Sequence, residues 1–316
     1  MLLGRGAGQE HGGKTGIMDS YVHGYHPREN ERLQDQAGVL VELLHSDTVY
    51  PAGTSVLEVG CGIGAQTVTL AQRSPGASLT SIDISGESLA QAHQRVAEAG
   101  LTNVQFGQAD IFDLPFRVES FDHVFVCFVL EHLSRPADAL AILKQLLRPG
   151  GTITVIEGDH GSAYFYPRSA AADEAIRCLV DLQRKAGGDA LIGRRLYPLL
   201  VDAKFEGARV SPRMVYVDSS RPELVDGFTK KTFTAMVEGI REAAISAGLI
   251  EQEGFDVGIR DLYRTAEADG VFCYTFFKGV AVKGRGRRYK PKATPVRPAR
   301  HRAGSQAHRG MMSEER

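Results

Sequence analysis

Three closely spaced glycines form the segment of the sequence that is best suited to binding a ligand. Gly60, Gly62 and Gly64 follow an apolar run and precede a stretch with helical spacing. Only glycine permits both the backbone angles and the close ligand approach that such a strand-to-helix turn requires. With Ala65 in the last place, the segment also satisfies the dinucleotide pattern G-x-G-x-x-G/A, so an NAD(P)-dependent oxidoreductase has to be considered. Asp83, nineteen residues beyond Gly64, could accept hydrogen bonds from both hydroxyls of a ribose, or cap the helix that follows it.

Polar side chains follow two later apolar runs. His132 comes after the run 121–126 and is the best candidate for a general base, because an imidazole titrates near neutrality; the alternative is a structural hydrogen bond at the start of the next helix. Glu157, Asp159 and His160 follow a further run, within the segment EGDHGS. We expect these three side chains to line the site. Their spacing also suggests a metal, but no further ligand is recognisable, and no metal site is predicted.

Short apolar runs alternate with helical stretches in the region that holds these residues. The expected strands are 55–59, 78–82, 104–106, 121–126 and 152–156, and the expected helices between them are 65–72, 87–99 and 136–147. This alternation implies a parallel sheet with right-handed crossovers and helices on both faces. Ligands of such sheets bind beyond the carboxyl ends of the strands, which is where the glycines and the polar residues lie.

Beyond Glu157 the alternation stops. Helices are expected at 170–186, at 196–203 and, as one or two, within 222–247, and strands at 209–217 and 271–282. The last run is aromatic and β-branched, and it fits an antiparallel addition to the sheet edge with helices inserted over the site. We therefore predict an α/β fold with a Rossmann-like, doubly wound, mostly parallel seven-stranded sheet, an antiparallel terminal strand and helical lid insertions.

Composition places the chain among ordinary globular proteins. Of its 316 residues, 43% are hydrophobic and 24% are charged, which argues against collagen, a disordered chain or a membrane bundle. No apolar run approaches the ~20 residues needed to cross a bilayer, and no signal peptide is recognisable, so we expect a cytoplasmic protein. The four cysteines contain no CxxC pair, so neither a zinc site nor a disulfide framework is expected.

The two ends of the chain differ in composition from its middle. The expected segments are a disordered N-terminal extension at 1–17, an N-terminal helical cap at 18–50, a cofactor-binding core at 51–160, substrate-lid helices and terminal strands at 161–283, and a basic disordered tail at 284–316. The cap contains a helix over 28–45, with apolar residues at spacings of three and four. The tail carries ten Lys or Arg against two Glu, whereas residues 1–283 have a net charge of −9.

Several segments together carry a family resemblance. They are LEVGCGIGA at 57–65 with Asp83, Gln108-Ala109-Asp110-Ile111, Phe121-Asp122, Leu130-Glu131-His132-Leu133, and Leu147-Arg148-Pro149-Gly150-Gly151. In this order and spacing, the chain from about residue 54 to about residue 157 resembles the class I S-adenosylmethionine-dependent methyltransferases. The resemblance implies S-adenosyl-L-methionine as cofactor and S-adenosyl-L-homocysteine as product.

The resemblance also implies roles for individual residues. The three glycines would line the methionine part of the cofactor and Asp83 would hold its ribose. Asp110 and Ile111 would meet the adenine, and Phe128 and Val129 would lie near the methyl donor. The full set of cofactor-binding residues so implied is Tyr21, Tyr25, Glu58, Gly60, Cys61, Gly62, Gly64, Asp83, Ile84, Ala109, Asp110, Ile111, Phe128 and Val129.

Charge near the glycine turn favours this cofactor over a dinucleotide. A dinucleotide presents a pyrophosphate to the helix N-terminus, whereas S-adenosylmethionine presents a carboxylate and a sulfonium. Glu58 would be an awkward neighbour for a pyrophosphate but can accept a hydrogen bond from an ammonium group, and Asp110 suits an exocyclic amine; a solvated Glu and a capping Asp are the alternatives. Tyr21 and Tyr25, if helical, share a face that either covers the cofactor or packs on the domain.

We therefore predict methyl transfer to O, N or C of a small organic acceptor of secondary metabolism. The catalytic candidates are His132, Glu157 and His160. Because methyl transfer is an in-line displacement, the protein mainly has to align the reactants, and a base is needed only if the acceptor is protonated. The acidic charge of residues 1–283 and the lack of a [DNS]-P-P-[YF] segment disfavour a nucleic-acid acceptor. No membrane partner is expected, and a homo-oligomer is left open.

Two alternatives remain from the sequence. An NAD(P)-dependent oxidoreductase is supported by the glycine pattern, but Asp110, the Pro149-Gly150-Gly151 turn and the lack of a well-placed Tyr-x-x-x-Lys pair argue against it. A non-catalytic protein could keep the cofactor pocket and use its basic tail to find a partner.

Overall fold

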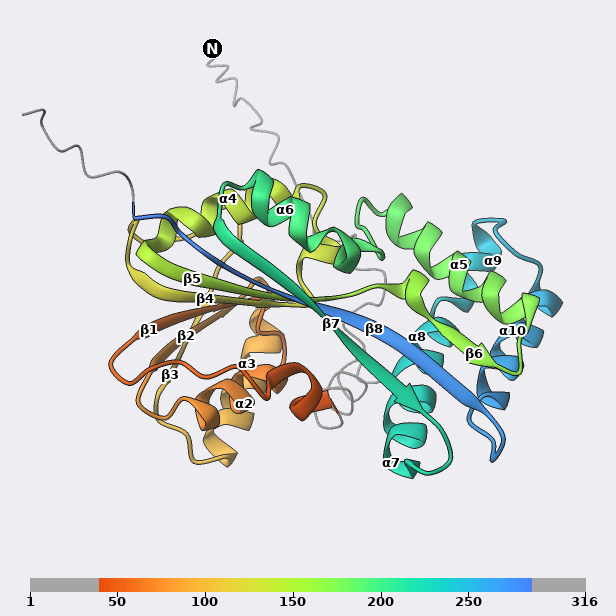
Figure 1. The fold of residues 1–316 in the computed structure, drawn as a ribbon. Coiled ribbons are helices and arrows are strands. Elements are labelled where there is room, and N and C mark those ends of the chain that lie inside the picture. Colours follow the sequence, from red (N-terminus) through yellow and green to blue (C-terminus); the bar gives the residue numbers. More distant parts are fainter. Residues whose placement is uncertain (1–39, 286–316) are drawn as a thin grey trace, which may run out of the picture. The chain divides into compact units, whose positions relative to one another are not determined.

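The computed structural model describes residues 40–285, and its centre is an eight-stranded mixed sheet (Figure 1). The five parallel strands are, in spatial order, β3 (Val104–Gln108), β2 (Ser78–Asp83), β1 (Ser55–Val59), β4 (Phe121–Cys127) and β5 (Leu147–Gly158). β8 (Val271–Val282) pairs antiparallel with β5, with the short β6 (Tyr164–Tyr166) and with β7 (Glu206–Val217). No helix within residues 40–285 is long and apolar enough to span a bilayer.

Helices cover both faces of the parallel strands. α2 (Ala65–Arg73), with α3 (Gly86–Glu98) beside it, lies on one face, and α4 (Pro136–Leu146) and α6 (Leu196–Asp202) lie on the other (Figure 1). The last four residues of β4 are all apolar because they face two cores: Val124 and Val126 belong to one core, and Phe125 and Cys127 belong to the other. Successive side chains of a strand point to opposite faces, so both faces of β4 need apolar residues.

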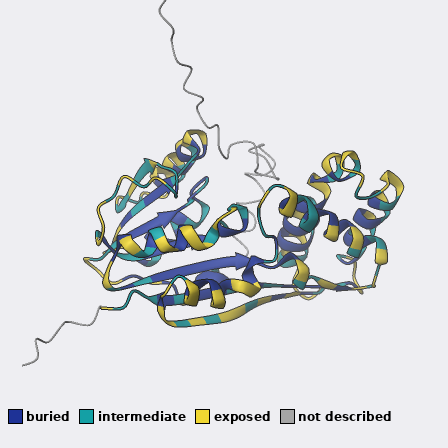
Figure 2. Cartoon of the chain, turned by 90° about the horizontal axis from the view of Figure 1, so that it is seen from above, coloured by how far each residue is buried: buried dark blue, intermediate teal, exposed yellow. Residues whose placement is uncertain are grey.

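A second group of helices covers the part of β8 that extends past β5. It consists of α5 (Ala170–Lys185), α7 (Pro222–Leu224), the π-helix η4 (Val225–Thr234), α8 (Ala235–Gly239), α9 (Arg241–Ser246) and α10 (Gln252–Arg264). Phe272, Tyr274 and Phe276 of β8 are buried in the core that these helices share. Figure 2 shows the helices with buried inner and exposed outer faces, as expected for amphipathic helices packed on a sheet.

The predicted fold class is confirmed, with differences in the extent of several elements. The strand expected at 152–156 is the longer β5, and the region 222–247 is divided into α7, η4, α8 and α9 rather than one or two helices. The sheet has eight strands rather than seven, because β6 contains only three residues, too few to show a pattern.

α10 was also not expected, because Gly254 and Gly258 lower the helix propensity of its sequence. The structure supplies the reason for Gly258: a Cβ at this position would lie 2.5 Å from the carbonyl oxygen of Ala171 in α5. The close crossing of the two helices therefore requires glycine. Of the helix expected at 28–45, residues 40–45 are helical. Residues 28–39, the extension 1–17 and tail residues 286–316 lie outside the described residues, and the expected segment boundaries stay predictions.

Candidate functional site

The three glycines of the turn after β1 are required for three different reasons. All have positive φ, at +69° for Gly60, +52° for Gly62 and +79° for Gly64. A Cβ at Gly60 would lie 2.4 Å from Cγ2 of Val129, and one at Gly64 would lie 2.9 Å from Cα of Ala92. A Cβ at Gly62 would meet no atom of residues 40–285 within 4 Å. Two of the glycines thus permit close packing within the protein, while Gly62 has no close neighbour among the described residues.

Four amides of this turn donate to acceptors within the protein. The hydrogen bonds are Gly60 N to Ile82 O at 2.8 Å, Cys61 N to Ile82 O at 2.9 Å, Gly62 N to Asp83 Oδ2 at 2.8 Å and Gly64 N to Cys61 O at 2.9 Å. A dinucleotide-binding turn instead directs its amides at a pyrophosphate. Here the amides of Gly60, Cys61 and Gly62 are committed to the end of β2, and the Gly64 amide is committed to the turn itself.

Asp83 ends β2 directly beside the turn. Its Oδ2 accepts the Gly62 amide, and its Oδ1 accepts the Ser85 amide at 2.9 Å. Burial raises the pKa of the Asp83 carboxyl, while these two amides act in the opposite direction. The side-chain cap of α3 is Ser85, whose hydroxyl accepts the Ser88 amide. Each carboxylate oxygen of Asp83 keeps a lone pair for a further donor such as a ribose hydroxyl.

Glu58 lies beneath the glycine turn and is buried. Its Oε2 accepts the hydroxyl of Thr67 in α2 at 2.7 Å and the hydroxyl of Ser81 in β2 at 2.6 Å. Burial raises the pKa of Glu58 to about 7, although the two hydroxyls lower it. The carboxylate therefore joins β1, β2 and α2 in the layer that supports the turn. Its expected contact with the cofactor's ammonium group stays a prediction.

The predicted adenine-side residues follow β2 and β3 next to one another. The Ala109 amide donates to the carbonyl oxygen that ends β2, at 3.0 Å. Asp110 turns the chain back on itself, because its Oδ1 accepts the Phe112 amide at 2.9 Å. Ile111 is buried and Ile84 is half-buried. The sheet therefore brings Ile84, Ala109, Asp110 and Ile111 together at the carboxyl end of neighbouring strands.

The turn after β4 is strained and is held by a buried carboxylate. Phe128 has φ of +57°, a left-handed conformation that is uncommon for residues other than glycine. Oε1 of Glu157 accepts the amides of Val129 at 3.1 Å and Leu130 at 2.7 Å. Burial and then the neighbouring Glu131 raise the pKa of Glu157 well above its ordinary value. Glu157 thus contacts backbone groups of the turn that presses Val129 against Gly60.

A buried polar cluster adjoins this turn, and its central residue is Glu131, which sequence reasoning did not single out. Oε1 of Glu131 lies 3.7 Å from Nε2 of His132, and Oε2 lies 3.6 Å from Nε2 of His160. Nδ1 of His160 is 2.9 Å from the hydroxyl of Tyr274, and Gln183 donates to Glu131 Oε2 at 3.2 Å. Burial alone would raise the pKa of Glu131, but the two histidines and Gln183 lower it well below its ordinary value. In the sequence, the feature that could have pointed to Glu131 is its acidic side chain beside His132.

Asp159, the third polar residue expected to line the site, binds within the protein. Its two oxygens accept a bidentate pair of bonds from Arg194, at 2.6 and 2.7 Å, and Oδ1 also accepts the Gly161 amide. The pair fixes the segment after α5 to the end of β5. Within residues 40–285 no three His, Cys, Asp or Glu side chains are grouped so as to hold a metal ion.

The N-terminal residues that the structure describes dock beside the ends of β4 and β5. Lys278 of β8, paired with Ile156 in the sheet, is buried and donates to the carbonyl oxygen of Leu44 and to Oδ1 of Asp47. The helical residues 40–45 are therefore anchored to β8 at this edge. Tyr21 and Tyr25 lie outside the described residues.

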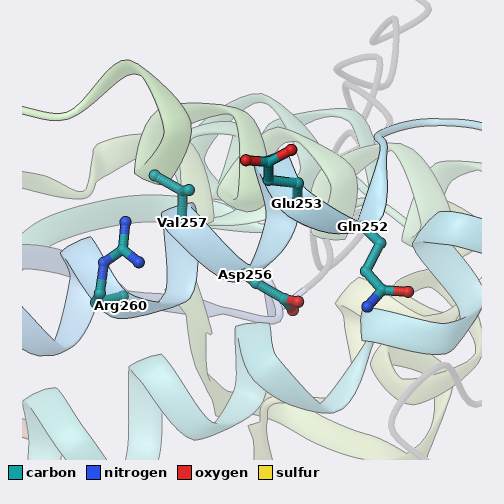
Figure 3. A pocket seen from close by; sticks show the side chains of 5 residues that line it. All are labelled: Gln252, Glu253, Asp256, Val257 and Arg260. Carbon is teal, nitrogen blue, oxygen red and sulfur yellow. The ribbon is translucent and has the colours of Figure 1, made fainter.

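A hollow of about 500 Å³ on α10 is separate from these residues (Figure 3). It is lined by Gln252, Glu253, Asp256, Val257 and Arg260. Arg241 of α9 engages both oxygens of Asp256, at 2.8 and 3.0 Å. No lining residue follows a parallel strand, so this hollow is not part of the candidate site.

Comparison with known proteins relates this chain to methyltransferases. A family model described as a methyltransferase domain matches residues 57–155. O-methyltransferase cnsE of Penicillium expansum is 33% identical over 193 residues, which cover 55% of this chain and 67% of that protein. A demethylmenaquinone methyltransferase of Tropheryma whipplei is 36% identical over 166 residues, covering 48% of this chain and 67% of that protein. The chain spans about half the length of several other curated relatives that it matches.

Among solved structures, phosphoethanolamine N-methyltransferase 2 of Haemonchus contortus, in complex with phosphomonomethylethanolamine and S-adenosylhomocysteine, shares the fold. The TM-score is 0.50 at 18% identity, over 79% of this chain and 53% of that chain. Two curated methyltransferases are covered over two thirds of their length at more than 30% identity, and the matched family model spans the glycine turn and the parallel strands. The chain therefore belongs to the class I S-adenosylmethionine-dependent methyltransferases.

Proposed function

We propose that this protein transfers a methyl group from S-adenosylmethionine to a small, largely apolar organic acceptor. The observation that carries the proposal is the glycine turn, in which four amides donate within the protein and a Cβ at Gly62 would meet no described residue within 4 Å. Asp83 beside the turn gives this place acidic character, and the carboxyl group of Glu58 lies beneath it. Such surroundings suit a positively charged metabolite and disfavour a pyrophosphate.

The protein's main task in this reaction is alignment. The cofactor, when bound, would supply a methyl group on a sulfonium, whose sulfur is a good leaving group, so the donor needs no activation. The residues after β4 would position the acceptor, because Val129 packs against the glycine turn and Glu157 accepts the amides of Val129 and Leu130. Well-oriented reactants reach effective molarities of roughly 10⁵ M or more, which supplies most of the acceleration.

His132 is the residue to which we assign proton removal from the acceptor. An imidazole can accept a proton near neutral pH, and Nε2 of His132 lies 3.7 Å from Oε1 of Glu131. The His132 side chain is 24% exposed, compared with 8% for His160. An acceptor therefore reaches His132 more readily, and His160 acts through Glu131 as a positioning residue. Glu157, with its backbone contacts, positions the turn after β4.

The surroundings of the site indicate the class of acceptor. The helices over β8 contribute apolar and aromatic side chains, and the relative from Tropheryma whipplei is named for demethylmenaquinone, a ring compound. We propose a neutral ring compound of secondary metabolism as acceptor and the cytoplasm as the location. The acidic charge of residues 1–283 argues against nucleic acid as a partner. The association of several copies of the chain stays a prediction.

Titration calorimetry with S-adenosylhomocysteine and, separately, with NADH tests the proposal. We expect one molecule of S-adenosylhomocysteine to bind per chain and NADH to give no heat. Asp83→Ala serves as a control within the site, and its affinity for S-adenosylhomocysteine should fall by about 1–3 kcal/mol because a ribose hydroxyl loses its acceptor. Binding of NADH alone would replace the proposal with the oxidoreductase alternative.

Enzymatic activity is tested separately from binding. Transfer of a labelled methyl group to a set of naphthols and quinols, by the full chain and by a chain that ends at residue 283, distinguishes an enzyme from a binding protein. We expect both chains to form methylated product at similar rates. Binding of S-adenosylhomocysteine without any product, combined with partner binding that requires the tail, would favour the non-catalytic alternative.

A further inference from the structure

The π-helix η4 contains three buried threonines that differ in their hydrogen bonds. Thr232 donates its hydroxyl to the carbonyl oxygen of Gly227, five residues earlier, at 2.7 Å. Thr229 and Thr234 are fully buried, yet their hydroxyls have no hydrogen-bond partner among the described residues. Buried hydroxyls in folded proteins nearly always have one. Two unpartnered hydroxyls in one short helix therefore call for an explanation.

The geometry of the helix places Thr229 and Thr234 on the same side. In a π-helix residue i bonds to residue i+5, so Thr229 and Thr234 stand one turn above one another on the same side. π-helical turns are rare and are frequently found at functional sites. The buried residues of η4 include no charged side chain, so the polar character of its inner face comes from the threonines.

Aromatic contacts connect η4 to the end of β4. The ring of Phe228, which precedes Thr229, lies 5.9 Å from the ring of Phe276, and Phe276 lies 5.5 Å from Phe128. Phe233, which precedes Thr234, lies 6.4 Å from His160. These contacts put η4, which lies between α7 and α8 in Figure 1, next to the turn after β4 and the buried polar cluster.

We propose that Thr229 and Thr234 form the polar part of the acceptor site and bind an uncharged hydroxyl or carbonyl oxygen of a ring compound. This inference rests on the proposed function and specifies its substrate class. Each threonine hydroxyl can donate one hydrogen bond and accept others, so either kind of oxygen is recognised. The neighbouring phenylalanines supply the apolar contact that binds the ring. The ligand oxygen would supply the hydrogen-bond partner that the described residues do not.

Thermal unfolding of three Thr→Val variants gives the first test. Valine has nearly the shape of threonine, so each change removes a hydroxyl and leaves the packing in place. We expect Thr229→Val and Thr234→Val to melt at the same temperature as the unchanged protein or higher, because burying an unpartnered hydroxyl is unfavourable. Thr232→Val, the matched control in the same helix, should melt lower because it loses the bond to Gly227.

Ligand binding gives the second test. The probes are 2-naphthol and 2-methylnaphthalene, which differ only in the group that would meet the threonines, and the protein is saturated with S-adenosylhomocysteine. We expect the unchanged protein to bind 2-naphthol and each of the variants Thr229→Val and Thr234→Val to bind it about tenfold more weakly, as for a lost hydrogen bond of about 1.4 kcal/mol. Binding of 2-methylnaphthalene should not change.

Three outcomes would overturn the inference. They are a lack of 2-naphthol binding by the unchanged protein, an equal loss of both probes in the variants, and melting temperatures of Thr229→Val and Thr234→Val that fall as far as that of Thr232→Val. The titration with S-adenosylhomocysteine in the same samples separates this inference from the proposed function. If S-adenosylhomocysteine binds but the variants keep full affinity for 2-naphthol, only the role of the threonines is lost.

Discussion

Gly62→Ala tests whether the open space at the glycine turn belongs to the cofactor. Gly62 has φ of +52° and a Cβ there meets nothing within 4 Å, so the free protein should lose only the left-handed strain of about 1–2 kcal/mol. Gly64→Ala adds to the same kind of strain a Cβ that lies 2.9 Å from Cα of Ala92. Because overpacking costs roughly 1–3 kcal/mol more, Gly64→Ala should lower the free energy of unfolding by about 2–5 kcal/mol.

In cofactor binding the order of the two variants should reverse. The methyl group of Gly62→Ala extends into the ligand space, so the affinity for S-adenosylhomocysteine should fall at least about tenfold, or ~1.4 kcal/mol. Gly62→Leu has the same backbone strain and should abolish binding. Gly64→Ala directs its methyl group at α3 and should bind more tightly than Gly62→Ala. Urea unfolding and titration calorimetry of the three variants give both quantities, and a folded Gly62→Leu protein with unchanged affinity would refute the reasoning.

Three further predictions concern the carboxylates and the proposed base. Burial raises the pKa of Glu58 from 4.5 to about 7, so its protonated form stabilises the folded protein. This contribution to the free energy of unfolding is fully present below pH 4.5 and is lost as the pH rises through 7. Glutamine at this position does not titrate, so the free energy of unfolding of Glu58→Gln relative to that of the unchanged protein should rise by about 2–3 kcal/mol between pH 5 and pH 8. Urea unfolding at the two pH values measures this, and the same difference between the two proteins at both pH values would contradict it. Glu157→Ala leaves the Val129 and Leu130 amides without an acceptor and should lower the free energy of unfolding by about 1–3 kcal/mol for each, whereas Glu157→Gln keeps an acceptor oxygen and should lose much less. His132→Ala should lower kcat by about 10²–10⁴-fold with little change in affinity for S-adenosylhomocysteine, and unchanged turnover would exclude it as the base.

The strand ends of the site were predictable because they depend on local patterns. Alternating apolar runs and helical stretches specify parallel strands, and parallel strands bring their carboxyl ends to one edge. Gly62, Asp83 and Asp110 are found there without any knowledge of tertiary contacts. Glu131 was missed because its surroundings come from distant parts of the chain: Gln183 in α5 is 52 residues away in sequence. No local pattern distinguishes a carboxylate that will be buried by a later helix from one that stays in solvent.

The helices over β8 were less predictable for a related reason. Gly258, which permits the crossing of α5 and α10, resembles in the sequence an interruption of a helix. In η4, Phe228 and Phe233 are five residues apart, a spacing that an α-helix does not place on one line but a π-helix does. The π geometry therefore follows from packing both rings against β8, where their neighbours are Phe272 and Tyr274.

The glycine pattern alone does not separate a dinucleotide site from an S-adenosylmethionine site, since both kinds of turn need small residues for close approach. The difference lies in the direction of the amides. Here Asp83 Oδ2 takes the Gly62 amide, and the carbonyl oxygen of Ile82 takes the amides of Gly60 and Cys61. The residue expected to hold the ribose thus also withdraws a donor that an anion would need. At this turn one carboxylate at the end of β2 thus takes the Gly62 amide and keeps lone pairs that we expect to accept a sugar hydroxyl.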